Sequence, residues 1–122
     1  MAEATPTTPP LKPDVGADTF LALDLRVARV LAVEPFPAAR RPAYRLTLDL
    51  GPDLGTRRSS AQITNYTPEQ LCDRQVVVAA NLGRTRIAGF VSEVLVLGGL
   101  EADGTVRLLE VDGELPPGAV VA

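Results

Sequence analysis

Alternating hydrophobic and polar residues run through much of the chain and predict short β-strands. Apolar residues occupy every even position from 44 to 50, and Arg45, Thr47 and Asp49 stand between them, as in a strand with one buried face. Residues 25–33 read LRVARVLAV, and their apolar phase changes twice, which predicts a bulge or strong coiling. Residues 76–81 are mostly apolar and β-branched, which predicts a strand buried on both faces.

Proline, glycine and capping residues separate these strands. Three prolines and two adjacent arginines in residues 34–43 predict a loop, and Gly51, Pro52, Asp53 and Gly55 predict a turn. Further strands are expected at three places, namely 57–63, 91–97 and 105–109.

Two short helices are also expected. Thr67 precedes Pro68 and stands three residues before Gln70, a capping pattern that predicts a helix to about Asp73. Near the N-terminus, Asp14 is expected to cap a helix through about residue 22. Its apolar side would be formed by Phe20, Leu21 and Leu23.

The predicted order of elements indicates an all-β fold. Five or six short strands, with a small helix between the third and the fourth, are typical of the five-stranded Greek-key barrel called the OB-fold. The length of 122 residues predicts one domain, which we place at residues 14–122. Residues 1–13 hold four of the eleven prolines and almost no apolar side chains, so we expect a disordered tail there.

The residue types exclude most familiar enzyme chemistry. The chain has no histidine, which removes His-based triads, His general bases and mixed Cys/His zinc sites. Cys72 is the only cysteine, so no intrachain disulfide can form, and a cytoplasmic location is expected. The sequence shows no phosphate-binding glycine motif, and we expect neither a signal peptide nor a membrane-spanning stretch. We therefore expect a non-enzyme without metal or cofactor and without membrane insertion.

Charge is distributed unevenly along the chain. The formal net charge is −3, yet residues 26–86 hold ten arginines against five acidic residues, while both ends are acidic. A basic centre of this kind fits either a nucleic-acid-binding surface or a salt-bridged surface.

Six segments in register resemble a known family. They are DLRV at 24–27, ARRPAYRL at 39–46, SSAQIT at 59–64, NY at 65–66 with PEQL at 68–71, VAANL at 78–82, and RIAGFVSEVLVLG at 86–98. From about residue 20 onward, the chain resembles the CsaA-type export chaperones of the tRNA-binding OB-domain superfamily. The resemblance implies a homodimer that binds unfolded preproteins and the export motor ATPase. It implies tRNA or structured RNA as the alternative ligand.

The candidate binding residues lie where OB-folds hold their ligands, on one barrel face and its flanking loops. They are Arg40, Arg41, Arg45, Ser59, Ser60, Gln62, Asn81, Arg84, Arg86 and Ser92. Arg84 and Arg86 are expected in the loop after the strand at 76–81. Asn81 either caps a turn with Gly83 or faces a ligand. The polar groups at 59–62 are either solvated or form a hydrogen-bonding face, and Ser92 marks a bulge, a ligand contact or a dimer contact. Tyr44, the nearest aromatic residue, fits a core role better than base stacking.

Overall fold

One long strand, β1 (Leu25–Pro35), organises the sheet of the computed structural model, which describes residues 8–122. Its first half pairs with β4 (Gln75–Ala79) and its second half with β2 (Tyr44–Asp49), both antiparallel. The pairing register with β2 shifts between Val30 and Ala32, which confirms the predicted irregularity in this strand. The bulge lets one strand bend between two neighbours.

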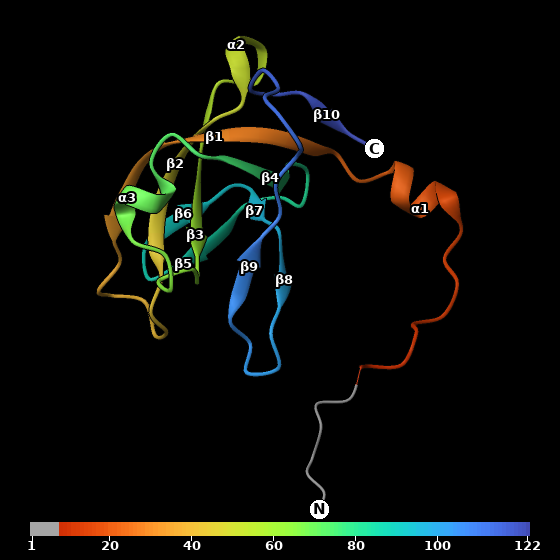
Figure 1. Ribbon diagram of the computed structural model, residues 1–122, viewed down its shortest axis with the longest axis horizontal. Coiled ribbons are helices and arrows are strands. Elements are labelled where there is room, and N and C mark those ends of the chain that lie inside the picture. Colours follow the sequence, from red (N-terminus) through yellow and green to blue (C-terminus); the bar gives the residue numbers. More distant parts are fainter. Residues whose placement is uncertain (1–7) are drawn as a thin grey trace, which may run out of the picture.

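The sheet path runs β3-β2-β1-β4-β7, and Figure 1 shows it curling into a barrel. The remaining elements are α1 (Ala17–Leu21), α2 (Gly51–Leu54), β3 (Thr56–Ala61), α3 (Pro68–Leu71), β5 (Thr85–Ile87), β6 (Phe90–Ser92), β7 (Leu95–Val96), β8 (Gly98–Leu100), β9 (Val106–Leu108) and β10 (Val120–Val121). The path and the position of α3 between β3 and β4 confirm the OB-type barrel.

The barrel interior is filled by aliphatic side chains from the strands. Leu46, Leu48 and Leu50 on and after β2 are buried, which confirms the alternation read there. All five residues of β4 are buried, as the apolar run predicted. Tyr44 packs against this core, and its hydroxyl donates a hydrogen bond to the carbonyl oxygen of Tyr66, so the core role is confirmed.

The helix α3 forms by the capping pattern seen in the sequence. The Thr67 hydroxyl accepts from the backbone N–H of Gln70, and the Gln70 side chain accepts from the N–H of Thr67. The helix ends at Leu71, two residues before the expected end, because Cys72 has an extended backbone with a ψ of 131°. Asp73, at a positive φ of 66°, then turns the chain toward β4.

The turn expected at residues 51–55 is present and takes the form of a single helical turn, α2. Two other local predictions were wrong. The strand expected at 91–97 is divided into β6 and β7, because Ser92 and Glu93 turn toward β3. The loop expected around Arg84 and Arg86 contains a hairpin, β5–β6, whose turn places Ala88 and Gly89 at positive φ.

The N-terminal segment lies beside the barrel in Figure 1. The helix α1 is shorter than expected and starts after Gly16, which has a φ of 78° and separates Asp14 from the first helical turn. Phe20, Leu21 and Leu23 are all exposed. Of the expected tail, residues 1–7 lie outside the described part, and residues 8–13 are exposed without helix or strand.

A seam between β3 and the segment after β6 completes the barrel. The backbone N–H of Glu93 donates to the carbonyl oxygen of Arg58 at 2.7 Å. In the other direction, two N–H groups of β3 donate to side chains: Arg58 N–H to the Glu93 carboxylate at 3.0 Å and Ser60 N–H to the Ser92 hydroxyl at 3.1 Å. Side chains thus take the place of part of a strand ladder.

Within residues 8–122, no helix is long and apolar enough to cross a membrane.

Candidate functional site

Loop 36–43, strand β3 and the β5–β6 hairpin bring several predicted residues around one hollow of about 790 Å³. Arg40 and Arg41 come from the loop, Ser60 and Gln62 from β3 and the residue beyond it, and Arg86 from β5. The hollow therefore joins guanidinium donors to a hydroxyl and an amide, which suits a ligand that has phosphates and polar base edges.

A second hollow, of about 690 Å³, shares Ala88 with the first and lies on the other flank of the hairpin. It is lined by Arg45, Arg58 and Arg84, by Glu93, and by Phe36 and Phe90. The two hollows together hold six of the eleven arginines of the chain and a single acidic residue. We call the set Arg40, Arg41, Arg45, Arg58, Arg84 and Arg86 the arginine face.

Two members of the arginine face are held in place by aromatic rings. The guanidinium carbon of Arg58 lies 4.6 Å from the ring centre of Phe90, and that of Arg45 lies 5.5 Å from the ring centre of Phe36. The two rings contact each other edge to face at 5.4 Å. Stacking restricts the long arginine side chains before a ligand arrives, which lowers the entropy lost on binding.

Acidic partners are few on this face. Arg58 pairs with Glu34 at 3.0 Å, and Arg84 pairs with Glu93 at 3.5 Å. Among residues 8–122, no carboxylate lies within 4.0 Å of the guanidinium groups of Arg40, Arg41, Arg45 or Arg86. Unneutralised cations grouped around concave surface concentrate positive potential there.

The structure does not bring every predicted residue to this surface. The Ser59 side chain is fully buried. Side chains on a strand alternate between its two faces, so Ser59 lies on the opposite face from Arg58 and Ser60. Ser92 is 9% exposed, and its hydroxyl is already bound to the Ser60 N–H in the barrel seam. Both side chains therefore belong to the interior and the seam of the barrel and do not line the hollow of Arg40 and Arg41.

Asn81 has a structural role that differs from both roles predicted from the sequence. Its side-chain oxygen accepts from the backbone N–H of Asp24, and its amide donates to the carbonyl oxygen of Ala22, each at 2.8 Å. Both polar groups of the amide are used to hold the segment between α1 and β1 against the end of β4. Asn81 is neither a turn cap with Gly83 nor a free ligand group.

A smaller groove of about 330 Å³ adjoins the first hollow and is mainly apolar. Leu82, Ile87, Val94 and Leu95 line it, and it shares Ser60, Ile87 and Leu95 with the first hollow. An extended apolar side chain could enter this groove beside the cationic surface.

Sequence reasoning missed Arg58 and the two phenylalanines. A signal for Arg58 was present, because positions 58, 60 and 62 share one strand face and the last two were already candidates. For Phe36 and Phe90 no such signal existed, since they lie 54 positions apart and only the folded hairpin brings them together.

In the described part of the chain, no three Cys, Asp or Glu side chains form a group that could hold a metal ion.

Comparison with known proteins now adds to this geometry. The sequence profile of the family described as the tRNA binding domain matches residues 25–120. The chain belongs to this family. The matched range contains the whole barrel and every member of the arginine face.

Methionine–tRNA ligases are one group of relatives that contain a similar segment. The methionine–tRNA ligases of Thermotoga maritima and Bacillus subtilis are 42% and 36% identical to it over 109 and 107 residues. These matches cover 88% and 87% of this chain but only 17% and 16% of the ligases. The chain therefore spans less than a fifth of the length of these relatives.

The similar solved structures include two chains that the match covers from end to end. The chaperone CsaA of Bacillus anthracis is 47% identical, with a TM-score of 0.85, and the match covers 90% of this chain and all of that one. The CsaA chaperone protein of Picrophilus torridus is 39% identical, also with a TM-score of 0.85, over 89% of this chain and all of that one. The expected likeness to CsaA is confirmed.

Proposed function

We propose that this chain is a CsaA-type module whose arginine face binds tRNA or similarly structured RNA. The observation that carries the proposal is the grouping of six arginines from three separate segments around two adjoining hollows with one acidic residue between them. Membership of the tRNA binding domain family supports it.

Each part of the face suits a part of an RNA ligand. Among residues 8–122, the guanidinium groups of Arg40, Arg41 and Arg86 have no carboxylate within 4.0 Å, so they suit phosphates, while Ser60 and Gln62 offer hydrogen bonds to sugar or base edges. Phe36 and Phe90 are only 6% and 7% exposed, so they offer no broad surface for stacking unpaired bases. The face therefore favours a folded RNA with closely spaced phosphates over an unstructured strand.

A titration with total tRNA at several salt concentrations tests this function. We expect binding that weakens steeply as salt rises, because each neutralised phosphate releases counterions. An unfolded preprotein titrated under the same conditions serves as the comparison ligand. Undetectable tRNA binding at low salt, with the protein folded, would contradict the proposal.

Capture of unfolded polypeptide is the second candidate, and the apolar groove beside the first hollow favours it. Backbone hydrogen bonds and a groove lined by Leu82, Ile87, Val94 and Leu95 can hold many extended sequences. The name chaperone carried by the two CsaA proteins supports this function. Binding to the export motor ATPase belongs to the same candidate.

Leu95→Asp tests the second candidate, since Leu95 is 49% exposed and lines the groove. We expect preprotein binding to be lost while the protein stays folded. Unchanged preprotein binding would contradict capture in this groove.

We also propose a cytoplasmic homodimer without enzymatic activity. The exposed Phe20 and Leu21 of α1 and Val120 of β10 offer apolar surface for a second copy, and a chain of this size has a modest core of its own. The single cysteine fits a reducing compartment. Sedimentation of a stable monomer at micromolar concentration would contradict the dimer.

A further inference from the structure

The Glu93 carboxylate lies within the second hollow of the arginine face, in a position suited to an anionic ligand. One carboxylate oxygen accepts from the backbone N–H of Arg58 at 3.0 Å, and the other lies 3.5 Å from the Arg84 guanidinium group. The side chain is only 20% exposed. The donors around it are therefore a backbone N–H and a guanidinium group, the same kinds of group that bind phosphate oxygens in proteins.

Two further guanidinium groups border the same hollow. Arg58 is stacked on Phe90, and Arg45 is stacked over Phe36, so both are restricted in the ligand-free protein. Arg45 also donates from Nε to the carbonyl oxygen of Pro35 at 3.1 Å, which leaves its terminal nitrogens available. Three arginines thus surround one internal carboxylate.

We propose that this hollow is a phosphate-binding subsite and that Glu93 occupies it until RNA arrives. The inference rests on the RNA-binding function proposed above and names one of its contacts. An RNA phosphodiester displaces the carboxylate, accepts from the Arg58 N–H in its place and contacts Arg84 and Arg45. The free phosphate ion shares this chemistry, so it can probe the subsite without RNA.

The barrel can tolerate the displacement. The Glu93 backbone N–H still donates to the Arg58 carbonyl oxygen, and the Ser92 hydroxyl still accepts from the Ser60 N–H. The seam keeps both of these bonds when the Glu93 side chain moves. Only the hydrogen bond from the Arg58 N–H changes its acceptor, from the Glu93 carboxylate to a phosphate oxygen.

The variant Glu93→Gln removes the negative charge and keeps an amide oxygen that can accept from the Arg58 N–H. The matched control is Glu114→Gln, because Glu114 pairs with Arg29 at 2.5 Å away from the arginine face and the change in net charge is the same. Arg84→Ala removes a ligand contact at a side chain that is 75% exposed, so it leaves folding intact.

Inorganic phosphate is titrated into each variant while the amide signal of Arg58 and the Nε–H signals of the arginines are followed by NMR. We expect saturable shifts of the Arg58 amide and of Arg45 and Arg84 in the parent protein. Affinity should rise roughly 1.5- to 5-fold in Glu93→Gln, the range expected for removing one partly exposed ion-pair competitor, and fall in Arg84→Ala. The Glu114→Gln control should match the parent.

Equal phosphate affinities in Glu93→Gln and Glu114→Gln would overturn the subsite, as would shifts confined to Arg40, Arg41 and Arg86. The same variants are then titrated with tRNA. If tRNA binds but phosphate gives no saturable shift at Arg58, the subsite is wrong and RNA binding stands. If phosphate binds as expected but tRNA does not, the RNA function is wrong and the anion site stands.

Discussion

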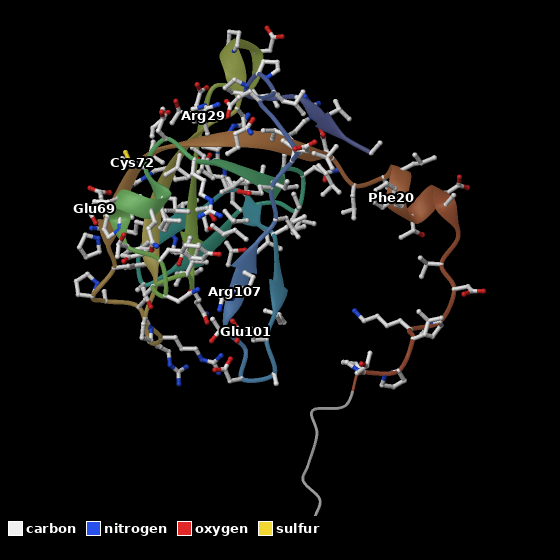
Figure 2. All side chains as sticks on the ribbon, viewed as in Figure 1. Phe20, Arg29, Glu69, Cys72, Glu101 and Arg107 are labelled. Carbon is white, nitrogen blue, oxygen red and sulfur yellow. The ribbon has the colours of Figure 1, made fainter. Side chains whose placement is uncertain are left out.

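Arginines inside and outside the arginine face differ in what their guanidinium groups contact. Outside the arginine face, Arg26 pairs with Asp24, Arg29 with Glu114, Arg74 with Glu110 and Arg107 with Glu101, at distances between 2.5 and 3.3 Å. Figure 2 shows Arg29 at one end of the molecule and the Arg107–Glu101 pair on the β8–β9 hairpin. On the arginine face, only Arg58 and Arg84 have such partners among residues 8–122.

The difference separates arginines whose charge is paired with a carboxylate of the chain from arginines that can bind an anion. The hydrogen bond to Asp24 raises the pKa of Arg26, and the hydrogen bond to Glu114 raises the pKa of Arg29. Both charges are paired with a carboxylate, whereas among residues 8–122 no carboxylate lies within 4.0 Å of Arg40, Arg41 or Arg86. A net charge of −3 therefore does not describe the local potential at the arginine face.

The largest expected effect is on tRNA affinity, when arginines inside and outside the arginine face are replaced by Ala. We expect Arg41→Ala with Arg86→Ala to weaken tRNA binding on the order of tens-fold at about 0.1 M salt, because two phosphate contacts are lost. The charge-matched control, Arg74→Ala with Arg107→Ala, should change it by less than about threefold. Filter binding measures both. Equal losses in the two double variants would show that net charge alone governs binding.

Asn81→Ala tests whether Asn81 stabilises the fold or contacts a ligand. The variant loses the bonds to Asp24 and Ala22, so we expect the free energy of unfolding to fall by about 1 to 2 kcal/mol. Asn65→Ala loses one bond, to Val106, and should cost about half as much. Urea denaturation measures both values. A large loss of tRNA affinity with unchanged stability would instead return Asn81 to the binding site.

The smallest effect is expected at Asp103, in the β8–β9 connection beside Arg41. The backbone hydrogen bond from Thr105 lowers the pKa of Asp103 below its ordinary value of 3.8. A carboxyl with a lowered folded-state pKa stabilises the fold above its unfolded pKa, and this stabilisation is lost as the pH falls through the folded pKa. Asp103→Asn should therefore melt slightly lower than the parent at pH 7, and the two curves should converge toward about pH 2. A constant difference across this range would contradict the assignment.

The sequence predicted most of the barrel because its strands carry strong local signals. Alternation at 44–50, the apolar run before Asn81 and the phase change in β1 each correspond to a strand or an irregularity in the structure. The division of 91–97 could not be predicted, because it depends on bonds from β3 to Ser92 and Glu93 across more than thirty residues. The two-residue strand β10 was likewise missed, since it exists only through pairing with β1.

The candidate site was predicted less completely than the fold. Residue type and loop position were enough to select Arg40, Arg41 and Arg86, which line one hollow. The alternation of side chains along β3 excludes Ser59 from the site and adds Arg58 to the face of Ser60. The bonds of Asn81 to a segment almost sixty residues away depend on tertiary structure, which composition and spacing do not encode.

The salt dependence of tRNA binding tests the central claim most directly. The parent protein is compared with a variant in which Arg40, Arg41, Arg84 and Arg86 are all replaced by Ala, and both are checked for folding by thermal melts. We predict that the log–log slope of affinity against salt flattens by about 0.7 to 0.9 for each lost phosphate contact. An unchanged affinity and slope in the fourfold variant would contradict the account, because the arginine face would then be a solvated surface.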